Sequence, residues 1–342
     1  MGVGENSYWT YESDRRHRGP MTAASPAAPT LRDVLAAQHR LAGQVVRTPA
    51  LSHRELDDAT GAAVVVKHEN LQHTGAFKVR GALNLLAADD APRRQGVVAY
   101  STGNHAQALA YAAARAGTPC TIVMPERPNP LKERAVRGLG AEVLLHGATF
   151  DDARAHAQEL AAQRGARLVG AADEPLLVAG VATATLELLQ QAPDLDVLVV
   201  PVGGGSGAAA ACLVTASLAP HVQVVAVQSA ASPAAHDSWR TGALVERPNR
   251  TRAEGLAVGR GFALTQELMR GRLDDFLLVT DDQISAAQRL YLTGARTVAE
   301  GAGAAALAAV LAAPERFAGR SVGVVCSGGN AGEEELRRAL DA

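Results

Sequence analysis

Short β-branched segments alternate with alanine-rich segments from about Leu31 onward, and this alternation restricts the possible folds more than any other feature. Most candidate strands are continuous apolar runs, as parallel strands buried on both faces usually are. The candidates are Val64–Lys67, Gly96–Ser101, Thr121–Met124, Glu142–Leu145, Arg167–Gly170, Val197–Val202, Val222–Gln228, Phe276–Thr280 and Val322–Cys326. Repeated strand–helix units of this kind predict an α/β doubly wound fold.

Polar, glycine-containing loops lie at four points where strands end and helices are expected to begin. These loops are His73–Phe77, Thr102–His105, Gly203–Gly207 and Ser327–Asn330. The expected helices include Ala106–Ala116, Asp151–Arg164, Val181–Gln191 and Ser285–Val298. Because ligands of open α/β sheets bind at the carboxyl ends of the strands, we expect the four loops to meet in one site.

The bulk composition excludes several classes of partner. The chain has 342 residues, enough for two domains, and its 47% hydrophobic content predicts a packed core. Its formal net charge is -2 and it has no basic stripe, so neither nucleic acid nor an anionic membrane is an expected partner. No apolar run is long enough to cross a bilayer.

The three cysteines, Cys120, Cys212 and Cys326, are far apart and have no metal-binding spacing. Such a sparse, odd set fits a reducing cytosol, so we expect a cytoplasmic protein. Residues 1–30 lack the apolar core of a signal peptide. We expect them to form a disordered leader and exclude them from the fold.

Lys78 is the strongest candidate for chemistry, because it follows Phe77 directly in the segment Gly75-Ala-Phe-Lys-Val-Arg-Gly81. A catalytic amine must be kept partly neutral by burial or by a nearby positive charge. Arg80 is expected to supply that charge or to orient a carboxylate. The alternative interpretation is a solvated lysine on the first turn of a helix.

The second loop, Ser101-Thr-Gly-Asn-His105, follows a strand and opens a helix, where N–H groups can bind a carboxylate. Asn104 and His105 could donate hydrogen bonds to a cofactor phenolate or to a substrate carboxylate. The alternative is a simple helix N-cap by Ser101 or Thr102, and for Thr102 we favour the cap.

The glycines of the third loop, Gly203–Gly207, allow backbone N–H groups to converge on a phosphate at a helix N-terminus. The loop lacks the Lys-Ser/Thr pair of a nucleotide P-loop, which disfavours ATP. In the fourth loop, Ser327 could bond a pyridine nitrogen without holding it protonated, which favours elimination of a β-leaving group. The alternative for both loops is a tight glycine turn.

Together these segments resemble the fold-type II pyridoxal-phosphate enzymes, and specifically the threonine/serine dehydratase and serine racemase family. Two further segments carry the resemblance: Ala253-Glu-Gly-Leu-Ala-Val258 and Glu300-Gly-Ala-Gly-Ala304. The resemblance covers nearly everything from Leu31 to the C-terminus. It implies a fold similar to the tryptophan synthase β chain, with two open, mostly parallel sheets flanked by helices, and a homodimer.

The resemblance also implies a role for each site residue. Lys78 would form a Schiff base with pyridoxal 5′-phosphate and shuttle the α-proton. The residues implied to hold the cofactor are Phe77, Asn104, Gly203, Gly204, Gly205, Ser206, Gly207, Gly255, Glu300 and Ser327. Those implied to bind the substrate carboxylate are Ser101, Thr102, Asn104 and His105.

The activity implied is an ammonia-lyase reaction, in which a β-hydroxy amino acid such as L-threonine or L-serine becomes a 2-oxo acid and ammonia. One alternative is an amino-acid racemase with Lys78 and Thr102 on opposite faces of the cofactor ring. Another is a β-replacement enzyme similar to cysteine synthase. By analogy, residues 31–86 and 172–342 would form a large cofactor-binding domain and residues 87–171 a small mobile domain.

Three positions depart from the family pattern. Ala76 replaces a serine, so we expect one hydroxyl donor near the cofactor or substrate to be lost and the substrate preference to change. Ser206 replaces a glycine in the phosphate loop, where phosphate binding should survive. Gln228 replaces the glutamate of a divalent-metal site found in racemase-like members, so we expect no metal.

Overall fold

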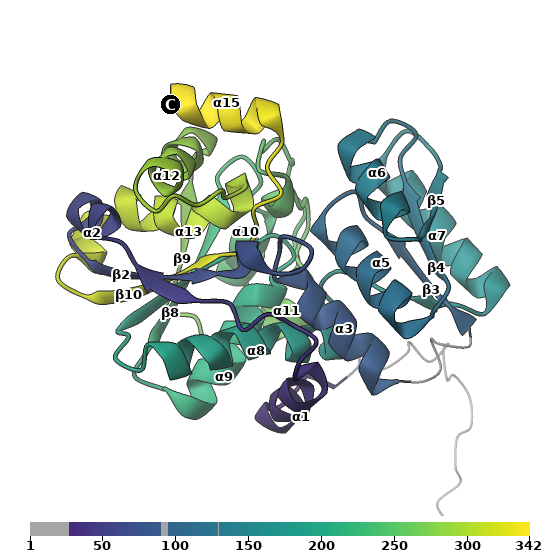
Figure 1. The fold of residues 1–342 in the computed structure, drawn as a ribbon, viewed down its shortest axis with the longest axis horizontal. Coiled ribbons are helices and arrows are strands. Elements are labelled where there is room, and N and C mark those ends of the chain that lie inside the picture. The colour runs from purple at the N-terminus through teal and green to yellow at the C-terminus, as the bar shows by residue number, and fades with distance from the viewer. Residues whose placement is uncertain (1–26, 90–94, 129) are drawn as a thin grey trace, which may run out of the picture.

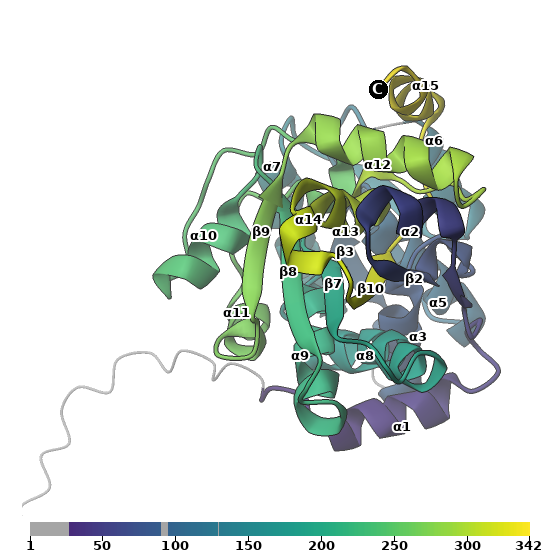
Figure 2. The ribbon, with the colours of Figure 1, turned by 90° about the vertical axis from the view of Figure 1, so that its left-hand side faces the viewer.

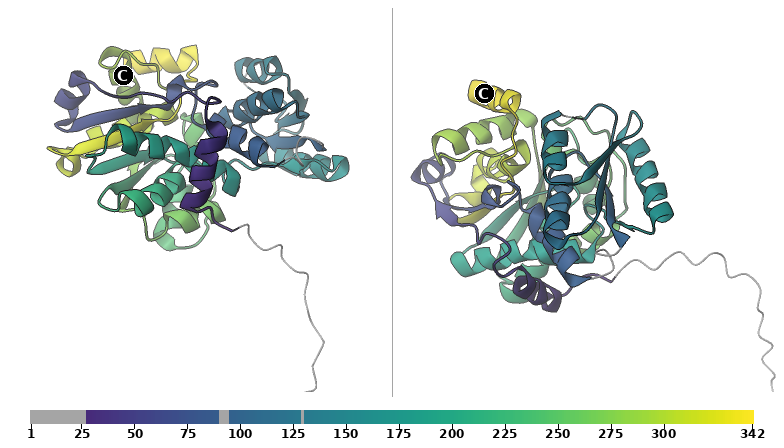
Figure 3. Two further views of the ribbon diagram at one scale, coloured as in Figure 1. Left: turned by 60° about the horizontal axis from the view of Figure 1, so that its bottom comes forward. Right: turned by 45° about the vertical axis from the view of Figure 1, so that its right-hand side comes forward.

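The computed structural model describes residues 27–89, 95–128 and 130–342. Most of the expected leader, residues 1–26, lies outside the described residues. The described strands form two sheets (Figure 1), with the orders β1-β2-β10-β7-β8-β9 and β5-β4-β3-β6. Figure 3 shows them as separate lobes, and helix α3, Lys78–Ala88, packs against helices of both.

The larger sheet is parallel except at one edge, where β1 pairs antiparallel with β2. Its strands are β1 (Ala50–Ser52), β2 (Ala63–His68), β7 (Val197–Pro201), β8 (Gln223–Ser229), β9 (Asp275–Val279) and β10 (Ser321–Cys326). Helices α12 and α13 cover one face, and α8 and α9 cover the other (Figure 2). Burial on both faces explains why these strands read as continuous apolar runs.

The smaller sheet is parallel throughout. Its strands are β3 (Val97–Tyr100), β4 (Cys120–Met124), β5 (Glu142–Leu145) and β6 (Arg167–Leu168). The helices between these strands are α5 (Asn104–Ala116), α6 (Pro130–Gly138) and α7 (Phe150–Arg164). The alanines of α5 and α7 pack on this sheet.

The remaining helices surround the larger sheet. They are α1 (Leu31–Leu41), α2 (Arg54–Thr60), η1 (Glu69–Leu71), α8 (Pro175–Gln191), α9 (Ser206–Leu218), α10 (Ala234–Thr241), η2 (Glu254–Leu256), α11 (Ala263–Met269), α12 (Asp281–Thr293), α13 (Gly301–Ala312), α14 (Pro314–Phe317) and α15 (Glu333–Asp341). Among the residues described, no helix has the length and apolar character needed to span a membrane.

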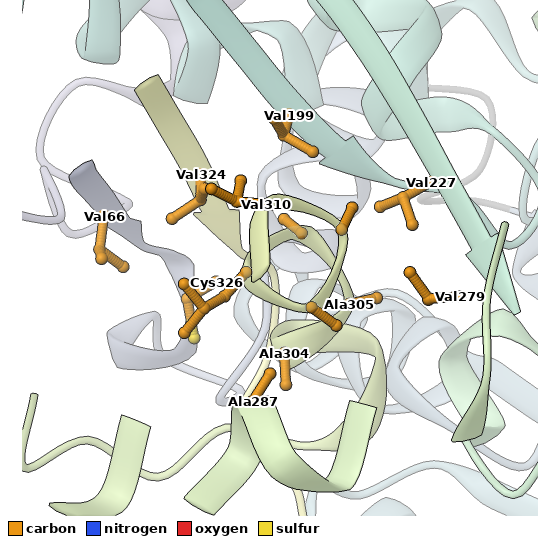
Figure 4. Packing of buried hydrophobic residues seen from close by; sticks show 14 of the residues in the cluster. Val66, Val199, Val227, Val279, Ala287, Ala304, Ala305, Val310, Val324 and Cys326 are labelled. Atoms are coloured by element: carbon orange, nitrogen blue, oxygen red, sulfur yellow. The ribbon is translucent and has the colours of Figure 1, made fainter. Parts of the chain in front are cut away.

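Helix α13 packs closely on the larger sheet because its buried face consists mainly of alanine. Figure 4 shows Val310 of α13 near Val199 and Val324 of the sheet, and Ala304 beside Ala287 of α12. The approach is closest at Gly303, where an added Cβ would lie 2.2 Å from the carbonyl oxygen of Gly328. This contact holds the loop after β10, which carries Ser327, against the start of α13.

All nine predicted strands are present, with ends that differ by up to two residues. The sequence analysis missed β1, a three-residue edge strand. The helix predicted for Ser285–Val298 is wrong at both ends. It begins at Asp281, because Thr280 forms a capping box with Gln283, and it ends at Thr293, before the C-cap Gly294.

Candidate active site

A cleft of about 1080 Å³ collects loops that follow strands of both sheets. Its walls include Ser101–His105 after β3, Gly203–Gly207 after β7, Ser327 after β10, and Phe77 and Lys78 at the start of α3. Small-molecule pockets commonly measure about 300–1,000 Å³, so the cleft has room for a cofactor and an amino acid together. The four loops singled out in the sequence all contribute to it.

Lys78 is partly buried in this cleft. Its Nζ donates hydrogen bonds to the carbonyl oxygen of Ala171 at 3.1 Å and to Ser206 Oγ at 2.9 Å, and it lies 5.1 Å from the centre of the Phe77 ring. Burial lowers the pKa of Lys78 to about 8. About a tenth of the amine is therefore neutral at pH 7, and the neutral amine is the form that acts as a nucleophile.

The chain contains only three lysines, and the other two are paired with carboxylates. Lys67 Nζ bonds Glu187 Oε2 at 2.8 Å, and Lys132 pairs with Glu254. Lys78 has no carboxylate partner among the residues described. It is therefore the amine best placed to react with an aldehyde.

The loop after β3 differs from its expected local structure. Helix α5 begins at Asn104, and its N-cap is Gly103, which makes no side-chain cap. The prediction that Ser101 or Thr102 caps this helix is therefore wrong. Ser101 Oγ instead accepts a hydrogen bond from the N–H of Gly103 at 3.2 Å, while Thr102 lines the cleft.

His105 lies in the first turn of α5, and its Nε2 is 3.1 Å from the carbonyl oxygen of Val169. Burial, together with the nearby Lys78 charge, lowers the pKa of His105 to about 4. The ring is thus neutral, and Nε2 carries its proton because a carbonyl can only accept. The ring has no N–H left for a carboxylate, whereas the backbone N–H groups of this turn have no intrahelical partner.

Asn104 connects this loop to the larger sheet. Its Nδ2 donates to Glu300 Oε1 at 2.6 Å, and its Oδ1 accepts from Asn330 Nδ2 at 2.8 Å. Burial raises the pKa of Glu300 to about 7, even though Lys132 and Asn104 favour the charged carboxylate. The orientation of the Asn104 amide is thereby set before any ligand binds.

The glycine loop provides a cradle from which neighbouring atoms exclude side chains. A Cβ added to Gly203 would lie 2.2 Å from the carbonyl oxygen of Gly255, and a Cβ added to Gly204 would lie 2.9 Å from Ala172 Cβ. Gly205 is the N-cap of α9 and has a φ of 93°, which favours glycine. Backbone N–H groups at the positive end of a 13-residue helix suit a phosphate.

Gly255 and Ser327 complete the cleft. Gly255 is confined by α13, since an added Cβ would lie 2.6 Å from Ala302 Cβ. Ser327 is buried, and its carbonyl oxygen accepts from the N–H of Phe77 at 3.0 Å. The Lys78 amine, the glycine loop and the Ser327 hydroxyl together fit a phosphorylated pyridine aldehyde.

Two residues that the sequence singled out lie outside the cleft wall. Arg80 does not line the cleft, because it is 0% exposed and its guanidinium bonds the carboxylates of Glu69 and Glu187. Ala76 is also 0% exposed and pairs with Gly328 in an isolated bridge, so its methyl group lies outside the cleft wall.

Gln228, at the position of the expected metal ligand in racemase-like members, is fully buried. Its Oε1 accepts a hydrogen bond from the backbone N–H of His236 at 3.0 Å.

The sequence analysis missed the cationic side chains of the cleft wall, which include Arg127, Arg154 and Arg260. Arg154 pairs with Asp151 on the same helix, at 3.8 Å, and Arg260 lies 4.9 Å from the centre of the Phe262 ring. These arginines come from segments far apart in the chain and share no motif. Only the folded chain brings them together.

The comparisons with known proteins agree with this geometry. The family model described as "pyridoxal-phosphate dependent enzyme" matches residues 41–328, so the chain belongs to that family. The predicted family and cofactor are thus confirmed, as is the predicted α/β fold with its two mostly parallel sheets.

Two curated relatives are named as ammonia-lyases. The chain is 40% identical to the L-threonine ammonia-lyase of Geobacter sulfurreducens over 300 residues, which cover 86% of this chain and 74% of that protein. It is 36% identical to the L-threo-3-hydroxyaspartate ammonia-lyase of Saccharomyces cerevisiae over 304 residues, covering 88% and 93%. The crystal structure of a threonine deaminase from T.th. superposes with a TM-score of 0.84 at 37% identity, covering 89% of this chain and 99% of that one.

Proposed function

We propose that this chain is a pyridoxal-phosphate-dependent ammonia-lyase that converts a β-hydroxy amino acid, such as L-threonine or L-serine, to a 2-oxo acid and ammonia. One observation carries the proposal. Lys78 is a partly buried amine with a pKa of about 8, and it lines a cleft between the Gly203–Gly207 loop and the N-terminus of α5. The names of the relatives support the reaction type.

Different residues of the cleft would bind different parts of the cofactor. Gly203–Gly207 and the start of α9 would hold the phosphate, Asn104 the ring oxygen, and Ser327 the pyridine nitrogen. When bound, pyridoxal phosphate supplies an aldehyde that condenses with amines and a ring that delocalises the electron pair left at Cα. Ser327 offers a hydroxyl where a carboxylate would keep the nitrogen protonated, which favours expulsion of a β-leaving group.

Lys78 and the start of α5 would act on the substrate. The backbone N–H groups of the first turn of α5, together with Ser101 and Asn104, bind the substrate carboxylate. Lys78 Nζ would take the Cα proton as general base. Loss of the Cα proton and of the β-hydroxyl, which leaves with a further proton as water, would give an enamine that hydrolyses to the 2-oxo acid and ammonia.

Release of 2-oxo acid by the purified protein tests this proposal. L-threonine, L-serine, threo-3-hydroxyaspartate and phenylserine are offered in parallel, with Lys78→Ala as the control. Oxo acid from at least one substrate, absent with Lys78→Ala, is expected. If the protein binds the cofactor but releases no oxo acid from any of them, the lyase proposal fails and β-replacement with an added thiol becomes the next reaction to measure.

A racemase activity is the second candidate, and it rests on Thr102. Because Gly103 is the N-cap, the Thr102 hydroxyl is not used as a helix cap and lines the cleft. It would serve as an acid on the ring face opposite Lys78. Thr102→Ala should abolish racemisation and leave elimination, whereas Thr102→Ser should retain both. Equal loss of both activities in Thr102→Ala would contradict this role.

The proposal also covers the location, the oligomeric state and the domain movement of the enzyme. We propose a cytoplasmic homodimer, supported by three buried, unpaired cysteines and by the resemblance to family members. We also propose that residues 87–171 close as a small domain over residues 31–86 and 172–342, with Asn104–Glu300 as a contact between the two parts. Closure would exclude water from the reacting centre. Light scattering of the purified protein tests the dimer.

A further inference from the structure

Ser206 contacts the amine at the centre of the proposed reaction. It is the first residue of α9, its side chain is 2% exposed, and its Oγ lies 2.9 Å from Lys78 Nζ. The family resemblance places a glycine here, so this hydroxyl is a feature of this particular chain. We propose that Ser206 is a positioning residue that ties the Lys78 amine to the phosphate loop. The inference rests on the role proposed for Lys78.

The first part of the argument is the direction of the Lys78 lone pair. A neutral amine has two N–H bonds and one lone pair. In Lys78 both hydrogens have oxygen acceptors, the Ala171 carbonyl at 3.1 Å and Ser206 Oγ at 2.9 Å. These acceptors belong to two separate segments, one after β6 and one at the start of α9. With two donor directions occupied, the lone pair has one direction left, which suits attack on an aldehyde held in the cleft.

The second part is the remaining hydrogen of Ser206. A hydroxyl can accept two hydrogen bonds and donate one, so accepting from Lys78 leaves its own proton available. Ser206 lies in the first turn of α9, where the backbone N–H groups would surround a phosphate. A hydroxyl that accepts a hydrogen bond also donates more strongly. A phosphate in the loop would therefore fix Ser206, and Ser206 would in turn fix Lys78.

The third part is the charge state of Lys78. An acceptor at 2.9 Å stabilises the ammonium form more than the neutral amine. Removing the hydroxyl should therefore lower the pKa of Lys78 below its value of about 8. The amine would become neutral at lower pH, but it would no longer be held in place.

The test follows capture of pyridoxal phosphate by the full-length protein after its cofactor has been removed, using visible absorbance across a range of pH. The variants are Ser206→Ala, Ser206→Gly and Ser206→Thr, with Ser217→Ala at the other end of α9 as the matched control. In the alanine and glycine variants, the midpoint of the pH profile should fall by about half a unit or more. Their limiting rate should fall about tenfold. Ser206→Thr and Ser217→Ala should keep the wild-type midpoint.

A second readout isolates the connection to phosphate. Pyridoxal, which lacks the phosphate, is offered with and without inorganic phosphate. Inorganic phosphate should accelerate capture by the wild-type protein and have no effect on Ser206→Ala. Unchanged midpoints and an unchanged phosphate response in both the alanine and glycine variants would overturn the inference. If the alanine variant does not fold, the glycine variant decides, since glycine is the residue the family pattern carries here.

Lys78→Ala separates this inference from the proposed function. Loss of capture in Lys78→Ala together with unchanged Ser206 variants would overturn only the role of Ser206. Undiminished capture in Lys78→Ala would overturn the proposed function itself.

Discussion

Glu187→Ala is expected to be the most destabilising change in a buried ion cluster behind the active site. Glu187 Oε1 accepts from Arg80 at 2.7 Å, and its Oε2 accepts from both Arg80 and Lys67 at 2.8 Å. Arg80 is 0% exposed and Lys67 1% exposed. Without Glu187, the two buried cations share Glu69 as the carboxylate of the cluster.

The magnitude follows from this imbalance of charge. Removing one partner of a buried ion pair costs about 3–5 kcal/mol, because the remaining charge stays out of water. With about 2.1 cal/mol/K of unfolding entropy per residue, a chain of 342 residues loses about 1.4 °C of Tm per kcal/mol. The expected loss is therefore about 4–7 °C, measured by thermal melts of the cofactor-loaded protein at one scan rate.

Glu334→Ala is the matched control. Glu334 pairs with Arg338 on the surface of α15 at 2.8 Å, where an exposed pair contributes about 1 kcal/mol or less. Its Tm should change by about 1 °C or less. If the Tm of Glu187→Ala also changes by only about 1 °C or less, the reasoning about the buried ion cluster is refuted. Because Arg80 lies two residues after Lys78 in α3, Glu187→Ala should also weaken cofactor binding.

Three further outcomes are expected. The wild-type rate of cofactor capture should rise with pH around a midpoint near 8, because the partly buried Lys78 amine must lose its proton to react; a profile that is flat between pH 6 and 9 would contradict this. Gly205→Ala should raise the Kd for pyridoxal phosphate about tenfold or more, through strain of about 1–3 kcal/mol at a φ of 93° in the phosphate loop. Gly117→Ala, with a φ of 63° outside the cleft, should leave that Kd unchanged. Burial raises the pKa of Glu300 from 4.5 to about 7, so between these two pH values the folded protein holds a proton that the unfolded chain has lost. The free energy of unfolding should therefore fall as pH rises through this window. Tm measured against pH should show this fall in the wild-type protein and lack it in Glu300→Gln.

The strands and loops were predictable because their signals are local. A parallel strand buried on both faces is a continuous apolar run, and a glycine loop directly after it marks a ligand site. This reasoning located Val197–Pro201 and the Gly203–Gly207 loop. Strand β1 was missed because it has three residues, two of them exposed, and so contains no apolar run.

The errors in the site concern tertiary contacts. Arg80 lies two positions from a cleft lysine, but a helix turns by about 100° per residue, so its side chain reaches Glu69 and Glu187 instead. Threonine is a common N-cap residue, but Gly103 rather than Thr102 is the N-cap of α5, which begins at Asn104. The hydrogen bond between Lys78 and Ser206 joins residues 128 positions apart, and no local pattern encodes it.

The position of the cofactor on the chain tests the central claim most directly. Borohydride reduction of the cofactor-loaded protein fixes the pyridoxyl group to whichever amine holds it, and peptide mass spectrometry then identifies the residue. With only Lys67, Lys78 and Lys132 in the chain, the result is unambiguous. We expect the label on Lys78 alone. A label on Lys67 or Lys132, or retention of the label in Lys78→Ala, would contradict the assignment of Lys78 as the reacting amine.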